Sequence, residues 1–283
     1  MAALEHKIDF ALIVTVKNAN PNGDPLNGNR PRETYDGYGE ISDVCIKRKI
    51  RNRFQDMGEN IFVQSADRAT DEFTSLQGRA EGCTELKAIV KGKKTDAVKY
   101  AEAACREWID VRTFGQVFAF KDISVGVRGP VSIQPAISVS PIDIVSMQIT
   151  KSVNGEDKAG RSSDTMGMKH SVDFGMYVIY GSVNCQLAEK TGFSAEDAAL
   201  LKEALKTLFE NDCSSARPEG SMEVCRLYWW EHDCKMPKYS SAKVHRQLKV
   251  NLKEGVQRPA SFWDYEISLD ALEGLYAEII DLI

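Results

Sequence analysis

Residues 8–16 read IDFALIVTV, and this stretch decides the fold that the rest of the chain must complete. Successive side chains of an extended strand point to opposite faces. One face of these nine residues is wholly apolar and carries Ile8, Phe10, Leu12, Val14 and Val16. The other face mixes polar and apolar side chains, namely Asp9, Ala11, Ile13 and Thr15. Strict alternation of this kind predicts a half-buried β-strand.

A long polar loop follows this strand and leads into a helix. Residues 17–40 are crowded with Asn, Gly and Pro, which favour turns, and a connection of this length is usually functional. Ser42 is a favourable N-cap with Asp43 in the first turn. Apolar side chains then recur at the spacing of one helical face, at Ile46, Ile50, Phe54 and Met57. We therefore expect a helix that begins at Ser42 and buries this face.

The exposed arc of this helix is strongly basic. Five cations occupy the seven residues from Lys47 to Arg53. A solvated helix face normally places acids one turn from its cations, and no acid occurs in this run. Lys47 and Arg51 lie one turn apart, and Arg48 adjoins them. The pattern favours an anionic partner over a merely solvated face.

Helix and strand patterns alternate along the rest of the chain, although residues 58–95 carry little periodic signal. Helical spacing predicts helices at residues 96–109, 191–210 and 268–283. Alternation with a period of two predicts strands at residues 131–139, 172–180 and 222–232. This order of elements predicts an α+β fold with an RRM-like, or ferredoxin-like, antiparallel sheet that carries large insertions.

The polar, Gly-rich stretch at residues 150–170 is bounded by strand patterns, which predicts a projecting β-hairpin. Met166 and Met168 stand beside Lys169 and His170. Adaptable apolar side chains next to cationic ones suit wedging against bases and phosphates. An ordinary solvent loop fits the same composition about as well.

The overall composition is that of an ordinary globular protein, with 283 residues, 43% hydrophobic and 27% charged. A net charge of −5 argues against a protein that coats nucleic acid indiscriminately, so any binding requires a local patch. No uncharged apolar run is long enough to span a membrane, and the first residues lack the order of a signal peptide. We therefore expect a cytoplasmic protein without membrane contact.

Seven cysteines at irregular spacing, without a CxxC pair, indicate reduced thiols. The one cluster that resembles a metal site comprises Cys225, His232, Cys234 and His245. Its spacing matches no standard zinc module, and alternation around Cys225 indicates a strand. We expect no metal and no other cofactor, and no nucleophile elbow, Walker loop or HExxH motif points to catalysis.

Seven short motifs occur in order along nearly the whole chain. They are NANPNGDP at residues 18–25, SDVCIKRKIR at 42–51, DVRTFG at 110–115, GPV at 129–131, KH at 169–170, TGFSAED at 191–197 and SSARP at 214–218. In these motifs the chain resembles the backbone subunit of the type I-C CRISPR surveillance complex, Cascade, which is a Cas-seven family protein of the RAMP superfamily.

The resemblance implies an RRM-like palm over residues 1–283, with helical fingers inserted at about 58–110 and a β-hairpin thumb at about 145–172. It implies that copies stack head to tail along a CRISPR RNA, beside other Cascade subunits, as a non-catalytic scaffold in antiviral defence. Target DNA would pair with the guide, and a recruited helicase-nuclease would cut it. By position, RNA contacts are expected from Asn18, Asn20, Asn22, Arg30, Lys47, Arg48, Arg51, Arg112, Met166, Lys169, His170 and Arg217. A structural salt bridge would equally explain Arg112 or Arg217.

Two alternatives remain open. Type III relatives in the RAMP superfamily cut RNA with an Asp in the loop after the first strand, and Asp24 occupies a comparable loop. A metal-dependent RNA endonuclease would need such a carboxylate, whereas Asp24, between Gly23 and Pro25, could simply fix a turn. The other alternative is a protein-interaction module, in which the basic helix would dock an acidic partner.

Overall fold

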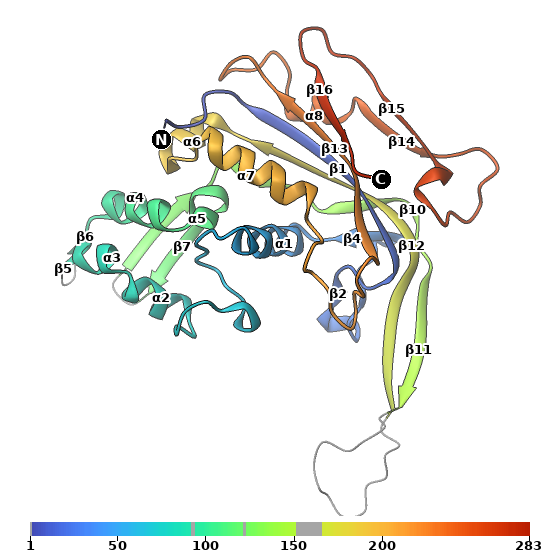
Figure 1. Cartoon of the computed structure of the whole chain (residues 1–283), viewed down its shortest axis with the longest axis horizontal. Helices are drawn as coiled ribbons and strands as arrows, with labels where there is room; N and C mark the ends of the chain where they lie inside the picture. The colour runs from blue at the N-terminus through green and yellow to red at the C-terminus, as the bar shows by residue number, and fades with distance from the viewer. Residues whose placement is uncertain (1, 92–93, 121–122, 151–165) are drawn as a thin grey trace, which may run out of the picture.

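The computed structural model describes residues 2–91, 94–120, 123–150 and 166–283, and its centre is a large antiparallel sheet. Eight strands form this sheet in the order β16–β13–β1–β12–β10–β4, with β9 and β11 also paired to β12. Their bounds are β1 Ile8–Ala19, β4 Tyr38–Ile41, β9 Val131–Ile133, β10 Ala136–Pro141, β11 Ile144–Thr150, β12 Met166–Val183, β13 Met222–Glu231 and β16 Ala277–Asp281. The predicted mixed fold with an antiparallel sheet is confirmed (Figure 1).

Strand β1 is buried on both faces, so the prediction of a half-buried strand is wrong. Its apolar even-numbered side chains pack against α1 (Asp43–Asp56) and α7 (Ala195–Lys206), which cover one side of the sheet. Its odd-numbered side chains lie beneath a C-terminal layer on the other side. That layer consists of α8 (Ser241–His245), β14 (Leu248–Leu252) and β15 (Tyr265–Leu269). Alternation within the strand cannot reveal a layer supplied by the far end of the chain.

The predicted closing helix at residues 268–283 is also wrong, because this segment contains the end of β15 and the edge strand β16. Gly274 has φ +76°, a left-handed conformation that interrupts a helix, and Leu272 and Leu275 form a β-bridge around it. β16 then pairs with β13 along its whole length, and Ile280 packs against the helical side of the sheet. Pairing with the sheet overrides the local helical spacing.

The other predicted elements are confirmed with shifted ends. The helix expected at residues 96–109 is α4 (Ala97–Glu107), and the one expected at 191–210 is α7, preceded by the short α6 (Cys185–Thr191). Ser194 and Asp197 form a capping box that fixes the start of α7. The strand expected at residues 131–139 is interrupted by Gln134 and Pro135, which separate β9 from β10.

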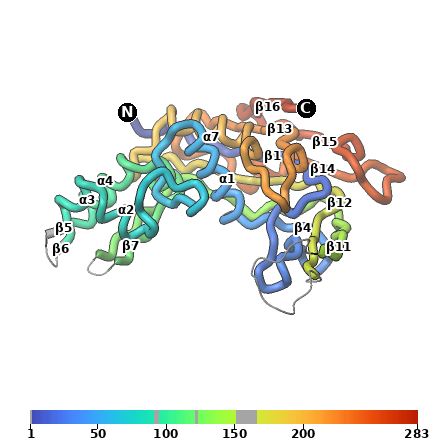
Figure 2. The backbone as a smooth tube through the Cα atoms, turned by 60° about the horizontal axis from the view of Figure 1, so that its bottom comes forward, coloured from blue at the N-terminus to red at the C-terminus, as the bar shows by residue number. Residues whose placement is uncertain are grey.

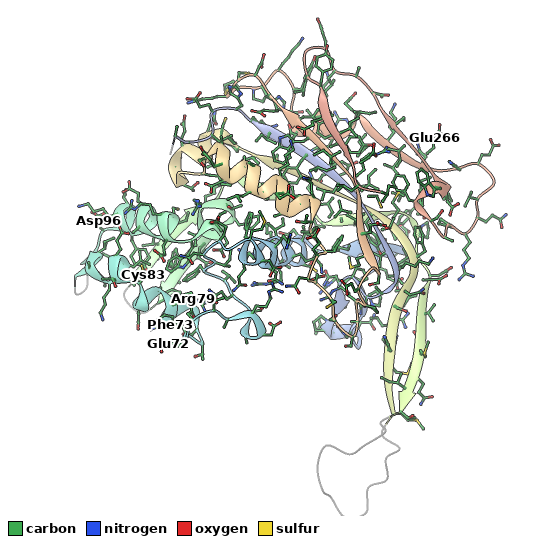
Figure 3. All side chains as sticks on the ribbon, viewed as in Figure 1. Glu72, Phe73, Arg79, Cys83, Asp96 and Glu266 are labelled. Carbon is green, nitrogen blue, oxygen red and sulfur yellow. The ribbon has the colours of Figure 1, made fainter. Side chains whose placement is uncertain are left out.

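Residues 58–91, 94–120 and 123–128 form a distinct lobe, which we call the finger lobe. It contains α2 (Leu76–Gly82), α3 (Thr84–Ile89), β5 (Val90–Lys91), β6 (Lys94–Thr95), α4, α5 (Ile109–Phe114), β7 (Gly115–Phe120) and β8 (Ile123–Arg128). Its own apolar core is built around the contacting rings of Phe62, Tyr100, Trp108 and Phe118. Arg79, close to Phe73 in Figure 3, binds Asp71 through two hydrogen bonds and holds α2 to the lobe.

The molecule has the shape of an arch. The finger lobe and the ribbon formed by β11 and β12 project from the same side of the main body, at opposite ends (Figures 1 and 2). α1 and the small hairpin of β2 (Gly23–Asp24) and β3 (Arg30–Pro31) lie between these two projections. Across the described residues, no helix has both the length and the apolar character needed to cross a membrane.

Asp9 anchors the C-terminal layer to β1. Its fully buried carboxylate accepts hydrogen bonds from Lys7 at 2.5 Å and from His232 Nε2 at 2.7 Å. Lys7 also donates to Ser241 Oγ at the start of α8, so the cluster joins three elements. Burial alone would raise the pKa of Asp9, but the hydrogen bonds from His232 and Lys7 outweigh burial and hold the pKa below its ordinary value.

We predict that Asp9→Asn lowers the free energy of unfolding at pH 7 by about 3 kcal/mol, because it leaves Lys7 without its buried counter-charge. The contribution of the carboxylate is present above its ordinary pKa of 3.8 and is lost as the pH falls through the lower folded value. Urea unfolding of both proteins at pH 7 and again below pH 3.8 measures this difference. A difference that does not shrink in acid would contradict the assignment.

Candidate nucleic-acid interface

The Asn-rich loop after β1 is a scaffold whose side chains are largely engaged within the chain. Asn22 Oδ1 accepts hydrogen bonds from the Ser42 backbone N–H at 2.9 Å and from its hydroxyl at 2.7 Å, which ties the loop to the start of α1. Asn20 is buried, and its Nδ2 donates to the Asn29 carbonyl. Asn18 is exposed and adopts φ +53°, a conformation that Asn tolerates better than most residues. Among these three asparagines, only Asn18 presents an exposed and unpartnered side chain within the described structure.

The five cations of the α1 run are each engaged within the chain. The contacts are Lys47 with Asp43, Arg48 with the Val63 carbonyl, Lys49 with Asp212, Arg51 with Asp110, and Arg53 with Glu210. The acids come from the first turn of α1, from α5 and from the loop after α7. Acids from elsewhere in the chain therefore pair with these cations, and the lack of acids within the run does not by itself indicate an external anion. Lys47 and Arg48 remain half-exposed at the surface.

Asp110 is the joint between α1 and the finger lobe. Its carboxylate is 1% exposed and accepts hydrogen bonds from the backbone N–H groups of Phe62 and Val63, at 2.8 and 3.0 Å. Arg51 Nε donates to the same carboxylate at 2.9 Å, and its guanidinium lies over the Phe114 ring. Arg51 was expected to grip RNA, but this geometry commits its side chain to the joint.

Arg112 forms a second joint, between the finger lobe and α7. Its guanidinium donates to both carboxylate oxygens of Asp197, at 3.0 and 2.8 Å. The two side chains are only 14% and 3% exposed. A bidentate, nearly buried pair of this kind leaves little surface for RNA, so the structure favours the salt-bridge explanation of Arg112.

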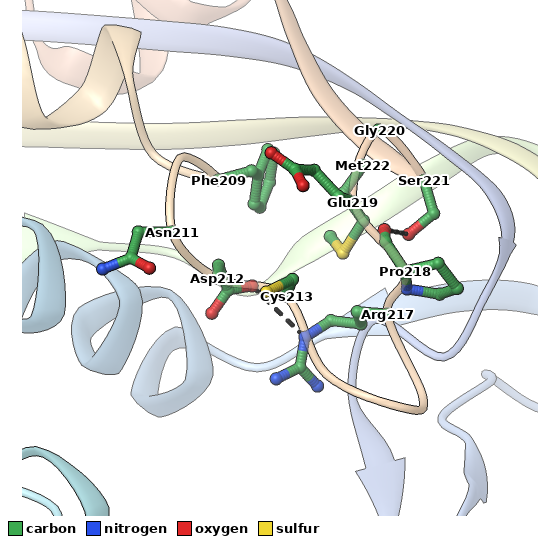
Figure 4. A pocket seen from close by; sticks show the side chains of 10 residues that line it. All are labelled: Phe209, Asn211, Asp212, Cys213, Arg217, Pro218, Glu219, Gly220, Ser221 and Met222. Carbon is green, nitrogen blue, oxygen red and sulfur yellow. Dashed lines mark hydrogen bonds and ion pairs between the residues drawn. The ribbon is translucent and has the colours of Figure 1, made fainter.

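A small cavity lies beneath the loop between α7 and β13, and Figure 4 shows the side chains that line it. Arg217 Nε donates to Asp212 at 3.2 Å, and Lys49 binds the same carboxylate from α1. Burial lowers the pKa of Lys49, and the nearby charge of Asp212 only partly opposes this shift. Lys49 and Arg217 thus share the Asp212 carboxylate, and Glu219 lines the same cavity. Sequence reasoning missed Lys49, because Asp212 is remote in sequence.

The ribbon has two faces, and the predicted thumb residues divide between them. Met166 and Met168 are 63% and 55% exposed and lie on β12 rather than in a loop. The strand register places them on one face, which we call the inner face, with Ser146, Gln148, Thr150 and His170. Lys169 lies on the opposite, outer face, with Val145, Met147 and Ile149. Residues 151–165, the rest of the stretch expected to form the projecting hairpin, lie outside the described residues.

The inner face of the ribbon is continuous with the Asn-rich loop. Arg30, at the start of β3, donates to Ser146 Oγ at 2.8 Å, and His170 Nδ1 lies 2.8 Å from the same hydroxyl. The structure therefore brings Arg30, His170, Met166 and Met168 to one side of the ribbon. These four expected contacts face the interior of the arch together with the loop, whereas Lys169 does not share their face.

Asp24 fixes a turn. Its carboxylate accepts a hydrogen bond from the Leu26 backbone N–H at 3.1 Å and lies 3.6 Å from Arg32. The carboxylate thereby caps the short 3₁₀ helix Pro25–Asn27. In the described part of the chain no three His, Cys, Asp or Glu side chains gather as a metal site. The geometry of Asp24 fits the turn-fixing explanation.

Comparisons with known proteins identify the family and the fold of the chain. Residues 6–270 match the family described as CRISPR-associated protein Cas7. A curated protein of that description from Haloferax volcanii is 27% identical over 251 residues, which cover 79% of this chain and 69% of the relative. A solved chain from a CRISPR RNA-guided surveillance complex in a pre-nicking state has a TM-score of 0.53 and 16% identity, and the match covers 89% of this chain and 84% of that one. This last likeness concerns the fold.

We predict that two cation-to-Met changes one turn apart in α1 have different effects on stability. Arg51→Met should lower the free energy of unfolding by about 3 kcal/mol, because it strands the buried Asp110 carboxylate. Lys47→Met, the matched control, should cost less than about 1 kcal/mol, because its pair with Asp43 is half-exposed. Denaturant unfolding measures both. Equal effects would show that the Arg51 joint is not a stabilising contact.

Proposed function

The chain belongs to the Cas7 family, and from this premise we propose that it is the RNA-binding backbone subunit of a type I-C Cascade complex. Copies of the chain line up head to tail along a CRISPR RNA. The protein holds the guide by its backbone and shape, while base pairing between guide and target DNA carries sequence recognition. The subunit acts as a scaffold without chemistry of its own.

The observation that carries this proposal is the arch, whose interior combines a few cations with an apolar wedge. Arg30 and His170 supply polar groups beside Met166 and Met168, and Arg217, whose side chain is 29% exposed, supplies a further cation. Sequence-tolerant binding of single strands requires this mixture of backbone attraction and contacts to base faces. The RNA contacts expected from Lys47, Arg48, Asn18 and Arg217 belong to the same proposal.

We further propose that the main sheet is an RRM-like palm with finger and thumb insertions. The strand order β13–β1–β12–β10 supports this, because α1 follows the first of these strands in the chain and α7 follows the third. The finger insertion, expected at about 58–110, has support from the separate apolar core of the finger lobe. The ribbon of β11 and β12 supports the thumb expected at about 145–172.

The remaining partners follow from the same premise. The complex contains other Cascade subunits, meets target DNA through the guide, recruits a helicase-nuclease for cutting and works in the cytoplasm in antiviral defence. The chain needs no cofactor for this role. Its acidic total charge is compatible with RNA binding because the attraction is local to the arch interior.

We predict that the mass of the complex rises in equal steps of one subunit as the CRISPR RNA is lengthened. The measurement is native mass spectrometry of complexes reconstituted with the other subunits on RNAs of increasing length. If a single copy is bound at every RNA length, the filament proposal is wrong and an RNA-processing role becomes the better explanation. Cleaved RNA in the presence of divalent ions, lost in Asp24→Asn, would revive the endonuclease alternative.

We predict that Arg30→Ala and Arg217→Ala each weaken binding to single-stranded RNA. Removing one phosphate contact should reduce the slope of log affinity against log salt by about 0.7. Lys238→Ala serves as the matched control, because Lys238 is an exposed cation of the C-terminal side of the molecule. An unchanged slope in both arginine variants would show that the guide takes another path.

A further inference from the structure

A shallow groove on the outer side of the sheet, with a mainly apolar floor, has no occupant within the described structure. Its floor comprises Gln134, Pro135, Ile137, Val139, Val178 and Tyr180, and its wall is β14, at residues 248–251. Ile137 is 40% exposed on this floor. The single charged lining residue, Lys249, is already paired with Asp270 at 2.5 Å. The groove therefore suits an uncharged segment that can cover the floor with apolar side chains.

The wall of the groove is an open strand edge. β14 pairs only with β15 among the described strands. Lys253 donates its backbone N–H to Asp264, and Asp270 donates to the Gln247 carbonyl, both in the register of that pair. Odd-numbered residues of β14 are therefore bonded to β15, and the backbone groups of Leu248, Val250 and Leu252 point to the open edge. An open edge is a template for another strand.

The outer strand of the ribbon presents a second open edge on the same molecule. Asp173 donates its backbone N–H to the Asp143 carbonyl, which commits the odd-numbered residues of β11 to β12. Even-numbered residues of β11 therefore point their backbone groups outward. On its outer face Val145, Met147 and Ile149 are 41%, 58% and 48% exposed. Residues Ile144–Thr150 carry no charge, which matches the lining of the groove.

We infer that β11 of one copy docks as an added parallel strand on the β14 edge of a neighbouring copy. This inference rests on the proposed head-to-tail assembly and names its contact. In a parallel pair, a residue whose backbone N–H and C=O point to the partner strand lies opposite a residue whose backbone groups point away, and the two side chains share one face. Val250 of β14 points its backbone groups to the open edge, so it lies opposite an odd-numbered residue of β11, Met147. The side chains of Val145, Met147 and Ile149 then cover the groove floor. An antiparallel pair would instead point Ser146 and Gln148 at the floor.

In this docking the two faces of the ribbon bind different partners. The outer face, with Met147, binds the neighbouring protein. The inner face, with Met166, Met168 and His170, stays available to the guide. Because β11 and the β14 edge are different surfaces, the contact is heterologous, and repetition generates an open filament rather than a closed dimer.

The test compares two disrupting variants with matched conservative ones, in complexes with the other subunits on a long CRISPR RNA. Met147→Asp places a charge on the apolar floor, and Val250→Pro removes an N–H that points to the open edge without breaking the β14–β15 ladder. Both should reduce the number of copies per RNA, whereas Met147→Leu and Val250→Thr should retain the wild-type number. Binding of a single copy to a short RNA should be unchanged in all four. Met147→Asp decides the matter if Val250→Pro fails to fold, because Met147 is exposed.

A cross-link tests the register. Met147→Cys combined with Val250→Cys should give a covalent ladder of subunits with a short bismaleimide in the assembled complex, and neither single variant should do so above background. A full number of copies in Met147→Asp overturns the docking while leaving the proposed function intact. If Met147→Asp instead releases another Cascade subunit while the number of copies of this chain per RNA stays unchanged, the occupant of the groove is that subunit and not a second copy of this chain. If the wild-type chain retains no RNA, the proposed function fails, and cross-linking of the double variant in concentrated RNA-free protein still decides the docking.

Discussion

The burial of β1 on both faces is the constraint on which the rest of this structure depends. A central strand covered on one side only would need one helical layer, and α1 and α7 supply it. The second cover, formed by α8, β14 and β15, brings the end of the chain across the sheet and leaves the β14 edge open beside β10. The second cover also buries the Asp9 carboxylate, which would otherwise face solvent. A buried carboxylate needs partners, and Lys7 and His232 supply them.

Two buried arginine–carboxylate pairs hold the projecting finger lobe to this body. Arg51 with Asp110 joins it to α1, and Arg112 with Asp197 joins it to the capped start of α7. Each pair connects segments that are distant in the chain, so each fixes the direction of the lobe rather than the stability of one helix. At the root of the ribbon Arg258 of the C-terminal segment also contacts Asp143 and Asp173, but all three side chains are exposed, so these pairs contribute little. Nearly buried charge pairs therefore fix the finger-lobe end of the arch rather than the ribbon end.

The sequence predicted the strands and helices whose periodicity is local, including β1, α1, α4 and α7, and the resemblance in its motifs pointed to the right family. It failed where distant segments decide. The segment predicted as the closing helix forms β16 because it pairs with β13. The α1 cations pair with Asp110, Asp212 and Glu210, which lie in other segments and are absent from a helical-wheel analysis of α1. Met168 and Lys169 lie on opposite faces because residues 166–170 form a strand. The sequence pattern placed these residues in a loop, so it could not separate the two faces. Single residues were therefore harder to assign than the fold.

The neutralisation of the α1 cations inside the chain has a consequence for how a filament would grow. Under the proposed function, a subunit with little unpaired charge would gain modest energy from any one stretch of RNA, so an isolated copy would dissociate readily. A copy that binds beside another would gain the protein contact as well, and binding would be cooperative. Growth would then proceed from a nucleus along one guide rather than by scattered binding to unrelated transcripts. The internal salt bridges of a single subunit would in this way lower its affinity for isolated RNA, so that stable binding would require neighbouring copies on one guide.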